Sequence, residues 1–403
     1  MGRVPGGRGG AHRRSHRLSF GNGITLLLPH DSSTMPQPLP PFMRHVLLTI
    51  DYEIFGNGSG DVRQHVVDPT ERMARIAERY QKPLVIYVEV EEYLAFQRHA
   101  AELTSALGYD PARLIRDQMR DLARRGHDVQ LHLHPEWHGA RLVNGRWQLD
   151  FTKRTVDSLF ETVEETTAYL AERKEDLREL AGLSASQPVL AYRAGAFSAQ
   201  PGTKLIPALA HNGFQIDSSV VHGLTQKNEH LDLDYRNAPA GKQMWRVRSD
   251  VAVEDASGPL WEMSIASVPG RRFHQLTPGR LKAKFSRNVP REQQSKMISD
   301  LGVKSNPAQM LKFLWQKIPL KMDFHNVAPR KLLRWIVEAE KPADGNPDVL
   351  VLIGHSKEYI DDAGFDRLLR GLVGNPGLRV STFPEVAAKL DRNESPTPSH
   401  LRN

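Results

Sequence analysis

The stretch DPARLIRDQMRDLARRGHDVQLHLHPEW, residues 110–137, contains a helix pattern followed directly by a strand pattern. Its first half carries apolar side chains at helical spacing and closes at Gly126, a residue type common at helix C-termini. The apolar run that follows ends in His132, His134 and Glu136. This order predicts a helix that packs on a sheet and then leads into one of the strands of that sheet.

The same alternation of strand and helix extends in both directions from this stretch. Strands are predicted at 45–53, 83–90, 127–134, 188–195, 214–219 and 348–356, and helices at 68–81 with Asp68 as its N-cap, at 155–180 and from about 202. Strands that are almost continuously Val, Leu and Ile are typical of parallel sheets covered by helices on both sides. The sequence therefore predicts the α/β class, either as an open doubly wound sheet or as a closed barrel.

The bulk composition is that of a soluble globular protein, with 39% hydrophobic and 25% charged residues among 403. No apolar run approaches the roughly 20 residues that span a bilayer. The apolar stretch 24–28 is shorter than the roughly 7–15 residues of a signal-peptide core, so we expect no secretion signal and a cytoplasmic protein. The chain has no cysteine, so any metal must be bound by His, Asp or Glu.

Three regions depart from the strand and helix pattern. Residues 1–42, rich in Gly, Arg and His and ending in a Pro-rich segment, predict a disordered basic leader and linker, and residues 393–403 a disordered tail. Within the folded part, 43–392, the rhythm is lost from about 222 to 341, which predicts an insertion or lid with helices at 290–302 and 306–318. Much of the net charge of +7 comes from the leader. A nucleic-acid arm is the alternative to a solvated leader, but no aromatic interleaving favours it, so nucleic acid is not expected as a partner.

Polar side chains stand where the predicted strands end. In parallel α/β folds the functional groups collect at the carboxyl ends of the strands. Side chains two apart on a strand share a face, so Asp51 and Glu53 point one way, and His132 and His134 likewise. The other strand-end residues are Arg193, Asp217 and His355.

These residue types allow two interpretations. Neutral imidazole and carboxylate together form an ordinary first shell for zinc or another divalent metal, with a position left open for water and substrate. Alternatively, the histidines bond to the backbone at a sheet edge, Arg193 forms a structural salt bridge and His355 is a core histidine. The metal interpretation is favoured because all these residues lie at strand ends.

In the order and spacing of four short motifs, residues 44–390 resemble the polysaccharide deacetylase family, with its NodB-homology domain, and in particular a branch that opens with Asp-Tyr-Glu. The motifs are TIDYE (49–53), GHDVQLHLHPEW (126–137), RAGAF (193–197) and VLIGHS (351–356).

The resemblance implies roles for individual residues. Asp51 would be the catalytic base or a metal ligand, Arg193 would orient the base, and His355 would be the general acid. His132 would be a metal ligand. Tyr52 stands where the family has a second aspartate, and Glu136 where it has a second ligand histidine, so Glu53 and either Glu136 or His134 are expected to complete the metal set.

The resemblance also implies a distorted (β/α)7 barrel that binds a divalent metal, zinc by expectation. The expected activity is hydrolysis of an N-acyl group on an amino sugar or glycan precursor. Trp137, Phe197, Asp217 and Lys357 are the expected substrate-binding residues. The alternative is a barrel without catalysis that binds carbohydrate or serves as a scaffold, which the substitutions at two metal positions favour.

Overall fold

Strand β1 (Arg44–Tyr52) is an interior strand of the main sheet, and all nine of its residues are buried. It pairs in parallel with β2 (Val85–Glu89) and with β14 (Val349–His355), and its first residues also pair with β15 (Leu378–Val380). A strand flanked on both sides and covered on both faces has no polar surface to present, which explains its run of aliphatic residues. The computed structural model describes residues 43–275 and 307–394.

Seven parallel strands form a ring. Their order is β1, β2, β3 (Asp128–Leu133), β6 (Ala191–Ala194), β7 (Ile216–Asp217), β11 (Leu260–Met263) and β14. The ring is closed by a parallel bridge between Ile265, two residues after β11, and Val351 of β14. The predicted distorted (β/α)7 barrel is therefore confirmed, and the open doubly wound sheet is excluded.

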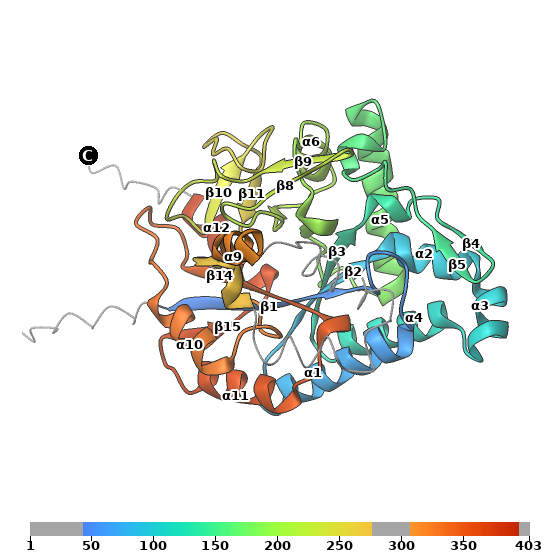
Figure 1. The fold of residues 1–403 in the computed structure, drawn as a ribbon, viewed down its shortest axis with the longest axis horizontal. Helices are drawn as coiled ribbons and strands as arrows, with labels where there is room; N and C mark the ends of the chain where they lie inside the picture. The colour runs from blue at the N-terminus through green and yellow to red at the C-terminus, as the bar shows by residue number, and fades with distance from the viewer. Residues whose placement is uncertain (1–42, 276–306, 395–403) are drawn as a thin grey trace, which may run out of the picture. The chain divides into compact units, whose positions relative to one another are not determined.

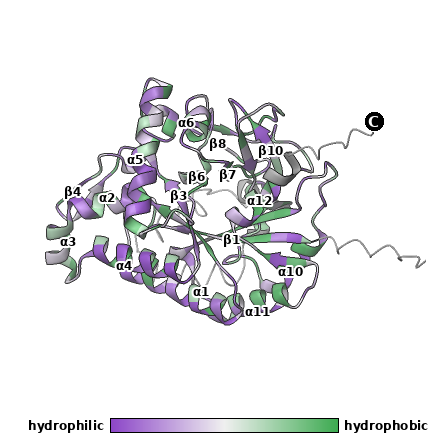
Figure 2. Ribbon diagram, turned by 180° about the vertical axis from the view of Figure 1, so that it is seen from behind, coloured by the Kyte–Doolittle hydropathy of each residue, from purple (hydrophilic) through white to green (hydrophobic). Residues whose placement is uncertain are grey.

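Helices surround this ring, as Figure 1 shows for α1, α4, α5 and α11. Their bounds are α1 (Asp68–Arg79), α2 (Val90–Arg98), α3 (Ala100–Leu107), α4 (Pro111–Arg124), α5 (Val163–Ala181), α6 (Leu205–His211), α9 (Pro307–Trp315), α10 (Pro329–Glu338), α11 (Asp362–Val373) and α12 (Phe383–Glu394). Hydrophilic and hydrophobic residues alternate along α1 and α4, as expected for helices with one face on the sheet (Figure 2). None of the helices in the described ranges is long and apolar enough to cross a bilayer.

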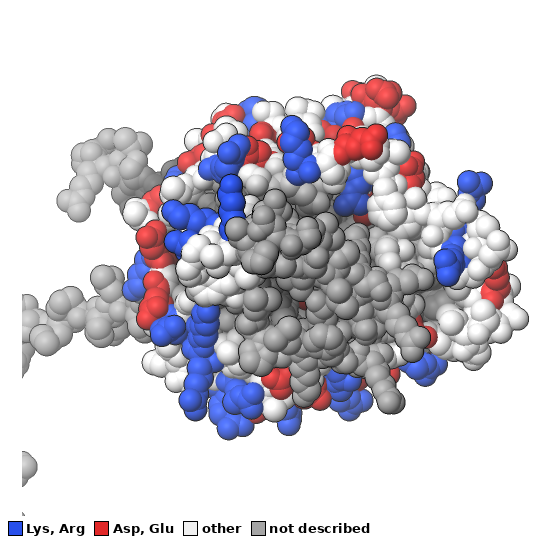
Figure 3. All heavy atoms as spheres, viewed as in Figure 1, with Lys and Arg blue, Asp and Glu red and all other residues white. Residues whose placement is uncertain are grey.

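Short antiparallel pairs stand outside the ring. They are β4 (Arg141–Val143) with β5 (Arg146–Gln148), β8 (Thr225–Asn228) with β9 (Leu231–Asp234), and β12 (Ser267–Arg271) with β13 (Lys317–Lys321), while β10 (Met244–Val247) extends the main sheet beside β11. Figure 3 shows Lys and Arg side chains interspersed with Asp and Glu around the described rim of one face.

The region 222–341, predicted as an insertion, is only partly an addition to the barrel, because it supplies strand β11 of the ring. The helix predicted at 306–318 is confirmed as α9. The leader at 1–42, the helix predicted at 290–302 and most of the predicted tail lie outside the described residues, and a lid over the site stays a prediction.

Two helix starts were predicted incorrectly. The helix predicted at 155–180 begins at Val163 as α5, after a separate 3-10 turn at Val156–Ser158. Asp68 is the first residue of α1 rather than its N-cap, and no side chain caps the helix. A π-helical turn, Arg63–Val67, runs directly into α1, so the backbone is already helical before Asp68.

Candidate functional site

The carboxyl ends of four ring strands bring the predicted site residues together. Asp51 of β1 is in register with His355 of β14, and His132 of β3 is in register with Arg193 of β6. Because neighbouring strands in a parallel sheet end at the same edge, residues as far apart in sequence as Asp51 and His355 become neighbours. The strand-end prediction is confirmed for these four residues.

Asp51 forms a buried ion pair with Arg193. Arg193 Nη1 donates to Asp51 Oδ1 at 2.6 Å, and both side chains are almost fully shielded from solvent. Burial by itself raises the pKa of Asp51, but the charges of Arg193, His132 and His355 outweigh it and hold that pKa below its usual value. Asp51 is therefore a carboxylate, able to accept a proton, at neutral pH.

Arg193 is fixed by contacts beyond this ion pair. Its Nη1 also donates to Thr49 Oγ1 at 2.9 Å, its Nε donates to the Ser218 carbonyl at 2.9 Å, and its guanidinium lies 4.2 Å from the centre of the Tyr87 ring. A guanidinium held at this many points presents its charge to Asp51 in one orientation.

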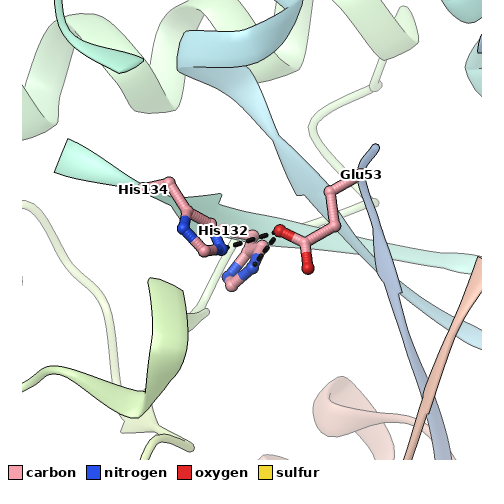
Figure 4. Close-up of side chains that lie close together, drawn as sticks. All are labelled: Glu53, His132 and His134. Atoms are coloured by element: carbon pink, nitrogen blue, oxygen red, sulfur yellow. Dashed lines mark ion pairs between the residues drawn. The ribbon is translucent and has the colours of Figure 1, made fainter. Parts of the chain in front are cut away.

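Glu53, His132 and His134 converge at the mouth of the barrel (Figure 4). Glu53 Oε2 lies 2.7 Å from His134 Nε2 and 3.4 Å from His132 Nε2, and one ligand atom from each residue falls within 4.8 Å of the others. All three side chains are buried. Two imidazole nitrogens and a carboxylate oxygen are a common zinc donor set, and three protein ligands leave a fourth position open.

The contacts behind these side chains fix their orientation. His132 Nδ1 lies 2.9 Å from the Arg193 carbonyl, and His134 Nδ1 lies 3.1 Å from Glu136 Oε1. These contacts direct Nε2 of both rings toward Glu53. Partners of this kind are characteristic of histidines that bind metal in proteins.

Glu53 and Glu136 each also accept a hydrogen bond from a basic side chain. Lys357 Nζ donates to Glu53 Oε1 at 2.7 Å, and Arg154 Nη1 donates to Glu136 Oε1 at 2.8 Å. The structure thus places Glu136 behind the His134 ring, bound to Arg154, whereas Glu53 points its second oxygen at both histidines.

The electrostatics of this group favour a positive charge between the carboxylates. Burial by itself lowers the pKa of His134, but Glu53 and Glu136 outweigh it and raise that pKa well above the usual range. Burial by itself raises the pKa of Glu53, but Lys357 and His134 outweigh it and hold that pKa well below the usual range. Without a metal, His134 is therefore protonated, and its positive charge lies between Glu53 and Glu136, where a metal cation would also be stabilised.

One atom supports the fit of a metal to these residues. His132 Nε2 is buried and makes no hydrogen bond among the described residues, since its contact with Glu53 lacks hydrogen-bond geometry. A buried polar nitrogen without a hydrogen-bond partner destabilises the folded state unless another group, such as a metal ion, binds it. The donor set and the unsatisfied nitrogen both fit a divalent cation.

His355 lies on the opposite side of Asp51 from this group. Its Nε2 is 3.5 Å from Asp51 Oδ2, and its Nδ1 is 3.9 Å from Glu358 Oε2. The backbone nitrogen of His355 donates to His325 Nδ1 at 3.1 Å. His355 is partly exposed, which leaves it within reach of a ligand at the barrel mouth.

The four predicted substrate-binding residues do not form one surface. Trp137 is 1% exposed and packs against the rings of Phe96 and Trp147, so the structure places it in the core. Lys357 is bound to Glu53, as described above. The remaining two, Phe197 and Asp217, also have protein partners.

Phe197 is half-buried, and the Lys321 ammonium lies 4.2 Å from the centre of its ring. Asp217 is fully buried and accepts a hydrogen bond from Ser219 Oγ at 2.6 Å. Burial raises the pKa of Asp217, and it raises the pKa of its neighbour Glu262 still further. Asp217 therefore belongs to a buried carboxyl pair beneath the site.

Two buried glutamates beside the site were missed by the sequence analysis. Glu89 and Glu92, at the start of α2, are 2% and 3% exposed. Burial, and then the charge of Glu53, raise the pKa of Glu92 to about 8. The signal available in the sequence was their place at the end of the predicted strand 83–90 and just beyond it, the same criterion that selected Asp51.

Comparison with known proteins yields structural matches only. No family model matches the chain, and no curated protein is similar to it in sequence. A Mycobacterium smegmatis protein described as a polysaccharide deacetylase is 15% identical, with a TM-score of 0.45, and the match covers 92% of this chain and 97% of that one.

Two further solved structures are similar to the same extent. The PuuE allantoinase is 11% identical, with a TM-score of 0.41, over 92% of this chain and 100% of its own. A 4-α-glucanotransferase from Thermococcus litoralis is 12% identical, with a TM-score of 0.45, over 86% of this chain and 40% of its own. The described activities differ, and these likenesses assign none of them to this chain.

Proposed function

We propose that this protein is a metal-dependent hydrolase that removes an N-acyl group, such as acetyl, from an amino sugar or glycan precursor. The observation that carries the proposal is the convergence of Glu53, His132 and His134 beside the Asp51–Arg193 pair, with His355 on the other side of Asp51. This arrangement places a metal donor set, a base and an acid together at the carboxyl ends of the ring strands.

Glu53, His132 and His134 would hold the metal, and Glu136 would orient His134. A divalent cation bound there would supply Lewis-acid chemistry, which lowers the pKa of water toward about 7 and polarises an acyl oxygen. Zinc is the proposed ion because its usual ligands are nitrogen and carboxylate oxygen, and this chain offers no thiolate.

Asp51 and His355 provide the proton transfers that amide hydrolysis needs. Asp51 accepts the proton of the attacking water while Arg193 keeps the carboxylate charged and in place. The water oxygen bonds to the acyl carbon, the C–N bond breaks, and His355 donates its proton to the departing nitrogen. The products are a free amine and a carboxylic acid.

The substrate class rests on the motif resemblance described above. An amino sugar carrying an N-acetyl group presents the required amide, and a cytoplasmic protein would meet it on nucleotide- or lipid-linked sugars. The proposed role of Phe197 is to contact the sugar ring, since it is half-buried next to Lys321 in the turn that follows β6.

The test is elemental analysis of purified wild-type protein beside His132→Ala, with His138→Ala as the matched control. His138 lies in the same segment but contacts Glu91 instead of the site. We expect about one divalent ion per chain in the wild type and in His138→Ala, and none in His132→Ala. Acetate release from N-acetylglucosamine oligomers and from UDP-N-acetylglucosamine, with and without chelator, reports the reaction.

Equal metal content in the wild type and in His132→Ala would contradict the proposal that His132 is a metal ligand. Metal binding at this site without hydrolysis of any N-acylated sugar would favour the alternative, a catalytically silent barrel that binds carbohydrate.

A further inference from the structure

The chain continues from β1 and from β3 beyond the last residues that pair with β2, the strand between them. On the β1 side, the last residue paired with β2 is Tyr52, opposite Val88. On the β3 side it is His132, opposite Glu89, and α2 begins at the next residue after Glu89. Glu53 and His134 therefore lie on segments that have lost their shared neighbour in the sheet.

Two carboxyl groups take the place of the missing strand. Ile54 N, next to Glu53, donates to Glu92, with both carboxyl oxygens at 3.1 Å. His134 N donates to Glu89 Oε1 at 2.9 Å. A buried backbone N–H without a carbonyl partner requires another acceptor, and here side chains from the first turn of α2 supply it.

The two glutamates are also tied to each other. Glu89 Oε2 accepts a hydrogen bond from Glu92 N and so caps the first turn of α2. The β1 extension, the helix start and the β3 extension thus form one connected unit. The distance between the Glu53-bearing segment and the His134-bearing segment is set by this unit.

We propose that Glu89 and Glu92 are positioning residues that hold Glu53 and His134 at the separation required for a shared divalent cation, an inference that rests on the proposed metal site. They act through the backbone and touch neither the metal nor the substrate. Loss of residues that orient metal ligands typically weakens metal binding by about 10–100-fold.

Glu91 supplies an internal control. It lies in the same turn and is 1% exposed, but its partners are Arg173 at 2.9 Å and His138 at 3.2 Å, not the extensions of β1 and β3. Substitution of Glu91 removes a buried carboxylate of the same helix turn without releasing Ile54 or His134.

The experiment measures zinc affinity of the full chain by competition with a chromophoric chelator, together with thermal stability. Glu92→Asp keeps the charge but shortens the side chain by one methylene, whereas Glu92→Gln keeps the reach and an acceptor oxygen. We expect zinc affinity to fall at least about tenfold in Glu92→Asp and in Glu89→Asp, and to stay within about threefold of wild type in Glu92→Gln. Glu91→Gln should lower thermal stability and leave zinc affinity unchanged.

The outcomes separate this inference from the proposed function. Wild-type zinc affinity in both aspartate variants would overturn the inference and leave the metal site intact. An equal loss of affinity in Glu91→Gln would also overturn it, because the effect would then be general destabilisation. Absence of zinc binding in the wild type would overturn the proposed function and this inference with it.

Discussion

Replacement of Arg193 by methionine should destabilise the barrel strongly, because it leaves the Asp51 carboxylate buried without its cation. The side chain of Arg193 is 0% exposed and that of Asp51 is 3% exposed. Removal of one partner of a buried ion pair costs about 3–5 kcal/mol. The Ser218 carbonyl also loses its donor. We expect the free energy of unfolding to fall by about 4 kcal/mol, or nearly a thousandfold in the unfolding equilibrium.

The assay is urea denaturation followed by tryptophan fluorescence, with the free energy of unfolding obtained by linear extrapolation. Asp51→Asn in the Arg193→Met background should restore part of the loss, because the uncompensated charge is then gone. Arg79→Met is the control, since Arg79 is 62% exposed and its ion pair with Asp366 should contribute no more than about 1 kcal/mol. A loss below about 1 kcal/mol in Arg193→Met, or full additivity with Asp51→Asn, would refute this reasoning.

Three further predictions concern pH, packing and metal. Burial raises the pKa of Glu262 well above its usual value of 4.5, so protonated Glu262 contributes fully to stability below pH 4.5, and this contribution is lost as the pH rises through the raised pKa. In Glu262→Gln this pH-dependent loss of stability should disappear. Urea midpoints with the same pH dependence in the wild type and in Glu262→Gln would contradict this prediction. Gly195→Ala would place a methyl carbon 2.4 Å from His134 Cγ and so displace the His134 ring, and zinc affinity should therefore fall at least about tenfold. In the control Gly56→Ala the added methyl carbon meets no atom within 4 Å, and this variant should bind zinc as the wild type does. Zinc at a thousand times its dissociation constant should stabilise the wild type by about 4 kcal/mol in thermal denaturation and have no such effect on His132→Ala; equal shifts would place the ion elsewhere.

The sequence was sufficient to predict the strand ends and the residues that meet there. Asp51, His132, Arg193 and His355 each follow a run of aliphatic residues, and parallel strands that end at one edge need no further information to bring them together. The period-two rule placed Glu53 with Asp51 and His134 with His132, and the observed convergence of Glu53, His132 and His134 agrees with it.

Other features depend on tertiary contacts that no local pattern encodes. Glu89, at the end of the predicted strand 83–90, and Glu92, just after it, were not predicted to be buried, because a carboxylate is rarely buried and the partners here are backbone amides of the segments that follow β1 and β3. Trp137 is of a residue type that often stacks on sugars, but its ring packs against two aromatic side chains in the core. Strand β11 has only four residues and lies within a region of irregular composition, so periodicity could not identify it.

The closure of the ring has a consequence for how the chain acquires its structure during synthesis. Strand β1 is the first described strand, but β14, which pairs along seven of its residues, follows about 300 residues later. A ribosome that adds 5–20 residues per second therefore needs roughly 15–60 seconds to supply that neighbour. Throughout this interval the β1 edge that ends in Asp51 has open backbone donors and acceptors, and a nascent chain in this state is exposed to pairing with other strands.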